Sequence, residues 1–99
     1  MGKLFDETIV SLNKLGIEIR DAEKHIYTLL ESCMTYEQVC TLSDYVDQLY
    51  KNVQNKAAMR APRFWWRKIY LKEAEMAVKR SKNKVRKAII EKYNTKTKL

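Results

Sequence analysis

Four cations and three aromatic residues lie together in residues 60–68, and this mixture of residue types is typical of surfaces that bind nucleic acid. Cationic side chains neutralise backbone phosphates, and flat rings stack on exposed bases. The expected contact residues are Arg60, Arg63 and Lys68 for phosphates and Trp65 or Trp66 for a base. Arg67 is expected to belong to the same binding surface. The alternative is that the rings belong to a hydrophobic core and the cations form a solvated collar around them.

A row of cations continues from this cluster along one side of the helix predicted next. The row consists of Lys68, Lys72, Lys79, Lys82 and Arg86. Its first and last members are 18 positions apart in the sequence, which at about 1.5 Å per residue is about 27 Å, enough to lie along roughly eight base pairs. Such a row contacts the backbone and does not read sequence. A solvated helix face is the alternative, but residues 77–89 contain no acidic residue that would balance the row.

Charge is distributed unevenly along the chain, whose formal net charge is +8. Residues 1–58 carry six cations and nine anions, whereas residues 59–99 carry fourteen cations and three anions. The net charges of the two parts are therefore −3 and +11. Because a field of one sign attracts ligands of the other, the C-terminal part predicts a polyanionic partner, either nucleic acid or an acidic protein.

The sequence offers no set of residues that is typical of catalysis or of metal binding. Cys33 and Cys40 lie seven residues apart without a CxxC pair, and His25 is the single histidine, which makes a poor zinc site. We expect two reduced thiols, with a local disulfide as the alternative. Phosphate-binding glycine loops, HExxH and GxSxG are absent from the sequence. We therefore expect a protein that is not an enzyme and uses no cofactor or metal.

The elements that must position these residues are helices. Two glycines and one proline among 99 residues leave few positions for the turns that a multi-stranded sheet needs. We expect an all-α protein in which an antiparallel helical hairpin precedes a long basic third helix, forming a three-helix bundle, and we expect this bundle to form a homo-oligomer. The expected single domain covers residues 1–93, with helices at about 3–32, 36–58 and 62–93, and a frayed polar tail follows at 94–99.

The first helix is predicted by apolar residues at every seventh position and a second set three residues later. The first set is Phe5, Leu12, Ile19, Ile26 and Cys33, and the second is Leu15, Ala22 and Leu29. Gly16 allows a different interpretation, because Leu15-Gly16-Ile17 also resembles a helix end with a left-handed glycine. The unbroken heptad favours a continuous helix, with a cost of about 1 kcal/mol for the glycine.

The second helix is predicted to begin after Thr35, which precedes Gln38 at the spacing of a capping box. Its apolar seam is Val39, Leu42, Val46, Leu49 and Val53. The short connection from the first helix makes the two helices antiparallel neighbours. Pro62 indicates a bend or break before the third helix, because the residue before a proline avoids helical geometry and proline fits a first helical turn.

The third helix has two apolar sides. The main stripe is Phe64, Leu71, Ala74, Val78, Val85 and Ile89, with Tyr70, Ala77 and Ala88 on its flank. The second strip is Trp65, Ile69 and Met76. A three-helix monomer cannot bury both sides, so the second strip predicts a contact with a second subunit, a partner or a ligand.

Two function hypotheses follow. The first is a non-enzymatic regulator that binds DNA or RNA; with about six phosphate contacts, its affinity falls roughly a thousandfold between 50 and 200 mM salt. The second is an adaptor or inhibitor, self-assembling in one version, that docks an acidic protein or a phosphorylated small ligand through the same face. A membrane surface is the weaker alternative, and no apolar run approaches the ~20 residues of a membrane span. The expected location is the reducing cytoplasm. The size and lysine-rich composition resemble small bacteriophage accessory proteins in style, without a motif that assigns a family.

Overall fold

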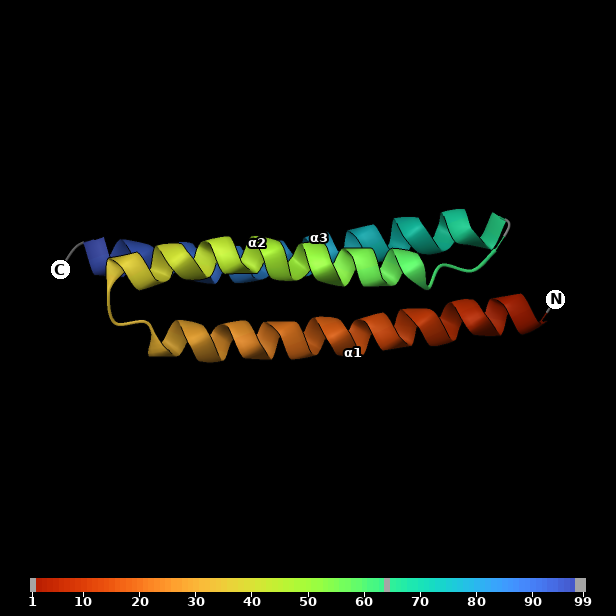
Figure 1. Ribbon diagram of the computed structural model, residues 1–99, viewed down its shortest axis with the longest axis horizontal. Helices are drawn as coiled ribbons and strands as arrows, with labels where there is room; N and C mark the ends of the chain where they lie inside the picture. The colour runs from red at the N-terminus through yellow and green to blue at the C-terminus, as the bar shows by residue number, and fades with distance from the viewer. Residues whose placement is uncertain (1, 64, 98–99) are drawn as a thin grey trace.

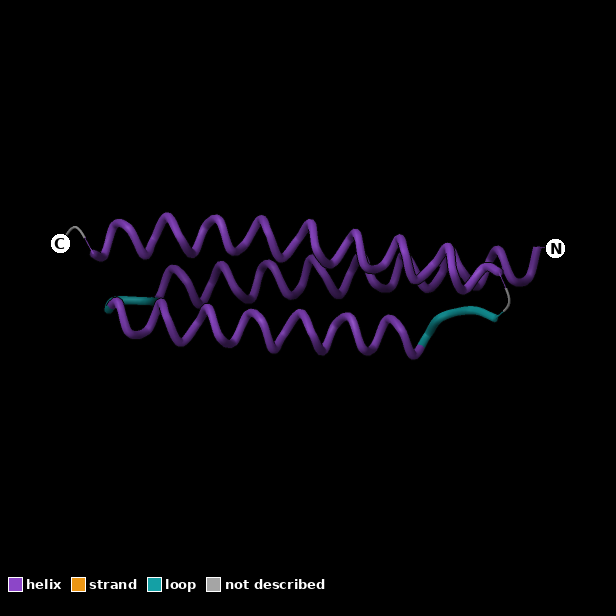
Figure 2. The backbone as a smooth tube through the Cα atoms, turned by 90° about the horizontal axis from the view of Figure 1, so that it is seen from above, coloured by secondary structure: helices purple, strands orange, loops and turns teal. Residues whose placement is uncertain are grey.

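Three long helices make up the part of the chain that the structure describes. The computed structural model describes the backbone of residues 2–63 and 65–97 and the side chains of residues 6–63 and 66–94. Helix α1 is Gly2–Ser32, α2 is Tyr36–Met59 and α3 is Trp65–Thr97. The helices lie side by side in a rod 58 Å long (Figures 1 and 2), with α2 antiparallel to α1 and α3. The all-α prediction is confirmed, and each pair of helices is in contact.

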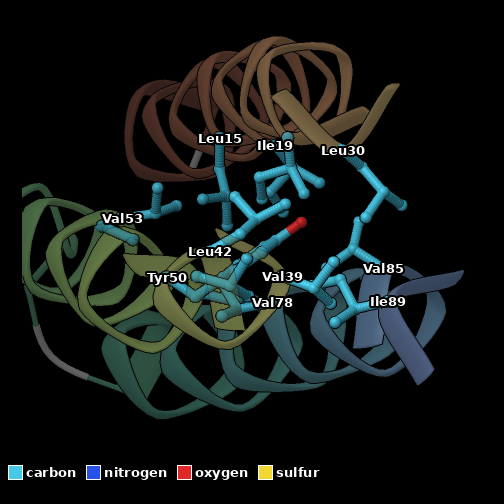
Figure 3. Packing of buried hydrophobic residues seen from close by; sticks show 14 of the residues in the cluster. Leu15, Ile19, Leu30, Val39, Leu42, Tyr50, Val53, Val78, Val85 and Ile89 are labelled. Carbon is cyan, nitrogen blue, oxygen red and sulfur yellow. The ribbon is translucent and has the colours of Figure 1, made fainter. Parts of the chain in front are cut away.

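The core runs along the axis of the bundle and takes side chains from all three helices (Figure 3). In α1 the buried residues follow the predicted seam at Leu15, Ile19 and Ile26. Leu12 of the predicted seam is only half-buried. At two other positions the next residue is buried instead: Leu30 in place of Leu29, and Tyr50 of α2 in place of Leu49. Both displaced leucines pack at the edge of the core. Each exchange is a shift of one residue, because the buried positions follow the period of about 3.6 residues of a straight helix and not the 3.5 of a strict heptad.

The core face of α3 is centred differently from the prediction. The buried residues are Tyr70, Ala74, Val78, Ser81, Val85 and Ile89. Tyr70, expected on the flank, is fully buried, whereas Leu71 is only half-buried. Tyr70 is held inside because its hydroxyl donates to the carbonyl oxygen of Ala57 at 2.7 Å. Phe64 and Trp65, which were assigned to the two apolar sides of the third helix, lie outside the described side chains, as does Phe5 of the predicted α1 seam.

The turn between α1 and α2 has the predicted capping box. Thr35 has extended backbone angles, φ −122° and ψ 157°. Its hydroxyl accepts a hydrogen bond from the Gln38 backbone N–H at 3.2 Å, and the Gln38 side-chain oxygen accepts one from the Thr35 N–H at 3.2 Å. These bonds satisfy donors that a helix start leaves without partners, so the chain reverses within three residues.

The connection from α2 to α3 is hydrogen-bonded to the last turn of α2. The Arg60 and Ala61 N–H groups donate to the carbonyls of Ala57 and Ala58, which ends α2. Pro62 is buried in the connection instead of starting a helix, and α3 begins at Trp65, three residues later than predicted. At its other end α3 continues to Thr97, past the predicted end at 93.

Helix α1 runs through Gly16 without a break, so the continuous-helix prediction is confirmed. A Cβ atom built on Gly16 meets nothing within 4 Å. We expect Gly16→Ala to raise the free energy of unfolding by about 0.5–1 kcal/mol, because alanine loses less backbone entropy in a helix. Thermal denaturation followed by circular dichroism measures this gain, and a lower melting temperature in the variant would contradict it.

Candidate nucleic-acid interface

The cations of the predicted row do not share one environment. Lys68, Lys72 and Lys79 are exposed on α3. Within the described part of the chain, none of the three ammonium groups forms an ion pair with a carboxylate. Their positive charge is therefore available to an external anion.

The cations at the C-terminal end of the row are paired with a carboxylate of α2. One oxygen of Asp47, Oδ1, lies 3.2 Å from Lys82 Nζ and 2.8 Å from Arg86 Nη2. A single carboxylate thus serves two cations, and this part of the row is not a free basic surface. Lys82 and Arg86, two of the five cations predicted to bind nucleic acid or a partner, are therefore paired within the bundle.

Arg60 is also engaged within the bundle. Its Nη2 atom lies 2.6 Å from Glu18 Oε1 of α1, and the side chains of both residues are about three-quarters buried. The Arg60 carbonyl accepts a hydrogen bond from Ser11 Oγ at 3.4 Å. Arg60 therefore ties the end of α2 to α1, and the predicted phosphate contact at this residue is replaced by a structural ion pair.

The aromatic cluster is only partly described. Trp66 is half-buried and is not without a partner, and the stacking contact predicted for it stays a prediction. The side chain of Trp65 lies outside the described residues, and so does the stacking contact predicted for it. Arg63 and Arg67 are exposed at the end of the rod where α3 begins, close in sequence to Lys68. Arg67 lies in the first turn of α3 and Arg63 precedes the helix, so exposed cations continue past the N-terminal end of α3.

A buried hydrogen-bond chain joins the three helices at mid-length. Tyr50 Oη lies 2.6 Å from Ser81 Oγ, and Ser81 Oγ donates to Glu23 Oε1 at 2.7 Å. Because a serine hydroxyl has one hydrogen, Tyr50 must be the donor to Ser81. Lys84 Nζ lies 3.7 Å from the other Glu23 oxygen. The chain was missed in the sequence because a single serine on a helix gives no sign that it is buried.

Burial raises the pKa of the Tyr50 hydroxyl, and the bond with Ser81 lowers it by a smaller amount. Burial likewise raises the pKa of Tyr70, against the charge of nearby Arg60. Both hydroxyls therefore keep their protons at neutral pH and act as donors. Their roles are structural, since each one bonds to a neighbouring helix.

The single histidine and both cysteines lie within the described part of the chain. His25 Nε2 lies 3.1 Å from the Tyr45 hydroxyl on the surface. The thiols of Cys33 and Cys40 are both free. Among the described residues, no three His, Cys, Asp or Glu side chains lie close enough to hold a metal ion. None of the helices, as far as they are described, has the length and apolar character that a membrane span requires.

Three exposed apolar side chains lie on α3 away from the core. They are Ile69, Met76 and Ile90, and we call them the α3 strip. Ile69 and Met76 belong to the predicted second strip, and the structure leaves both exposed. Ile90 was missed because the polar residue Asn83 interrupts the series.

Comparison of the chain with known protein families, with curated proteins and with solved structures gave no match.

Proposed function

We propose that the protein is a non-enzymatic, nucleic-acid-binding regulator that contacts the phosphate backbone through α3. The observation that carries the proposal is the exposure of Lys68, Lys72 and Lys79 without a carboxylate partner in the described part of the bundle. Unbalanced cations on one helix repel one another, and this cost is offset when a polyanion binds.

The expected footprint is shorter than the whole row. Asp47 beside Lys82 and Arg86 repels a phosphate, so the contacts are expected to lie between Arg63 and Lys79. From Lys68 to Lys79 the helix rises about 17 Å, which is roughly five base pairs of duplex. Two further exposed cations precede Lys68 in the sequence. The five cations expected to contact phosphates are therefore Arg63, Arg67, Lys68, Lys72 and Lys79.

A salt titration tests the proposal. We expect a labelled 20-base-pair duplex or 20-nucleotide single strand of mixed sequence to bind at 50 mM NaCl in fluorescence anisotropy. Five phosphate contacts give a slope of log affinity against log salt of about −4.5 for a duplex, a roughly 500-fold loss between 50 and 200 mM. If neither probe binds at 50 mM, the proposed function is wrong.

The carboxylate of Asp47 is expected to repel phosphates at the C-terminal end of the interface. Removal of its negative charge is therefore expected to strengthen nucleic-acid binding. Asp47→Asn releases Lys82 and Arg86 from their shared partner, and we expect duplex affinity to rise about fivefold, the effect of roughly 1 kcal/mol for one charge in water. Asp44→Asn is the matched control, because exposed Asp44 lies on the same helix and has no ion pair within the described residues. An equal gain in both variants would show that only net charge matters.

A further inference from the structure

The α3 strip has the spacing of a helix that packs lengthwise against another helix. Ile69, Met76 and Ile90 are 44%, 46% and 58% exposed, and Asn83 occupies the remaining position of this seven-residue series. One apolar residue in every seven supplies one of the two seam positions of a coiled coil, and a single asparagine at such a position sets the register. The core of the bundle does not use these residues, because the buried side of α3 is the opposite one.

Charges beside the strip favour one kind of partner. The positions three and four residues after 69, 76 and 83 are Lys72, Glu73, Lys79, Arg80, Arg86 and Lys87. All six are exposed, and five are cations. In a coiled coil, the residues that flank the apolar seam select the partner by charge. A second copy of α3 would set cations against cations, whereas an acidic helix would match them.

The surface beside the strip is recessed. A hollow of about 350 Å³ opens between α1 and α3, lined by Gly16, Ile19, Glu23, Ala77, Arg80, Ser81 and Lys84. Consecutive residues of a helix point about 100° apart, so the four α3 residues of the hollow lie between the strip and the buried side of the helix. Nothing lies within 4 Å of the position of a Gly16 Cβ, so the α1 wall is open at this point.

We propose that the α3 strip docks an acidic amphipathic helix of a partner protein, with apolar residues on the strip and Asp or Glu against the flanking cations. Lys72 and Lys79 belong to both surfaces, so the docked helix excludes nucleic acid. This exclusion rests on the proposed function above, whereas the docking does not. The partner then acts as a regulator that releases the protein from nucleic acid.

A synthetic helix serves as the probe. We use a labelled peptide of about four heptads with leucine at the seam positions and glutamate on both flanks, and the same peptide with lysine in place of glutamate. In fluorescence anisotropy at 100 mM NaCl we expect the full-length protein to bind the acidic peptide and not the basic one. Equal binding of both peptides, or binding of neither, would overturn the docking proposal.

Substitutions locate the bound peptide. We expect Met76→Gln to weaken acidic-peptide binding at least tenfold without changing the melting temperature, since burial of a methionine side chain contributes about 1.5 kcal/mol or more. Val10→Gln is the control, because Val10 is a 63% exposed apolar residue on α1. Undiminished binding by the Met76 variant, or an equal loss in both, would reject the strip as the docking site. A protein that sediments as a dimer, and as a monomer after Met76→Gln, would assign the strip to a second copy and also overturn the proposal.

Competition with duplex DNA separates the two proposals. We expect unlabelled 20-base-pair duplex to displace the acidic peptide from the wild-type protein at 50 mM NaCl. Simultaneous binding of both would overturn the exclusion. If the duplex does not bind the protein alone, the proposed nucleic-acid function fails, while the peptide titration still decides the docking proposal.

Discussion

Replacing Lys68, Lys72 and Lys79 together by glutamine is expected to lower the affinity for a mixed-sequence duplex about a hundredfold. Each lysine contributes roughly 1 kcal/mol to phosphate attraction in a solvent-exposed setting, and three such losses correspond to about two powers of ten. The salt slope is expected to flatten by about 2.7, because three counterion-releasing contacts are lost. Anisotropy titrations at three salt concentrations between 50 and 200 mM measure both effects.

The matched control carries the same change in net charge on other helices. Lys14, Lys24 and Lys51 are exposed on α1 and α2, and their replacement by glutamine removes three positive charges. We expect this triple variant to bind within about threefold of the wild type, since its cations lie outside the interface. Lysine and glutamine have similar helix propensities, so neither triple variant is expected to unfold. Equal losses in the two variants would show that binding follows net charge and that α3 has no special role.

The helices were predictable because their signals are local. The capping box of Thr35 and Gln38 needs only four consecutive residues, and the heptad across Gly16 needs only one helix. Periodicity alone placed most of the core of α1 and α2. The start of α3 was less predictable, because Pro62 fits a first helical turn by its own geometry but is buried in the connection in this fold.

The core of α3 shows where periodicity fails. Its buried positions from Tyr70 to Ile89 follow steps of four and three residues that average more than 3.5, so the predicted stripe was rotated on the helix. Tyr70 and Ser81 carry hydroxyls, and their burial depends on acceptors from other helices. A sequence gives no information on such acceptors before the helices are paired.

The ion pairs of the proposed interface could not be predicted for the same reason, because their partners lie on other helices. The exposure of Lys68, Lys72 and Lys79 follows from their side of α3, which the sequence gives. The pairing of Arg60 with Glu18, and of Lys82 and Arg86 with Asp47, depends on carboxylates that are far away in the chain. Charge patterning therefore identified the basic helix face, but it could not separate free cations from paired ones.

The buried hydrogen-bond chain gives the second large effect, this time on stability. We expect Ser81→Ala to lower the free energy of unfolding by about 1–3 kcal/mol, because the buried Tyr50 hydroxyl then has no acceptor. Tyr50→Phe is expected to cost about 1 kcal/mol, since Ser81 keeps its bond to Glu23. Chemical denaturation of each variant measures these losses.

The double variant tests whether the three groups act as one chain. Once Ser81 is alanine, removal of the Tyr50 hydroxyl also removes the unpaired polar group, so the double variant is expected to lose about 0.5–3 kcal/mol less than the sum of the single losses. Ser43→Ala is the control for the gain in helix propensity, because half-buried Ser43 lies on α2 and has no hydrogen bond among the described side chains. Additive losses would mean that Tyr50 finds another acceptor, and the chain would then not couple the three helices. Non-additive losses would show that one serine hydroxyl holds α2 to α1 through α3, the helix that also carries the free cations.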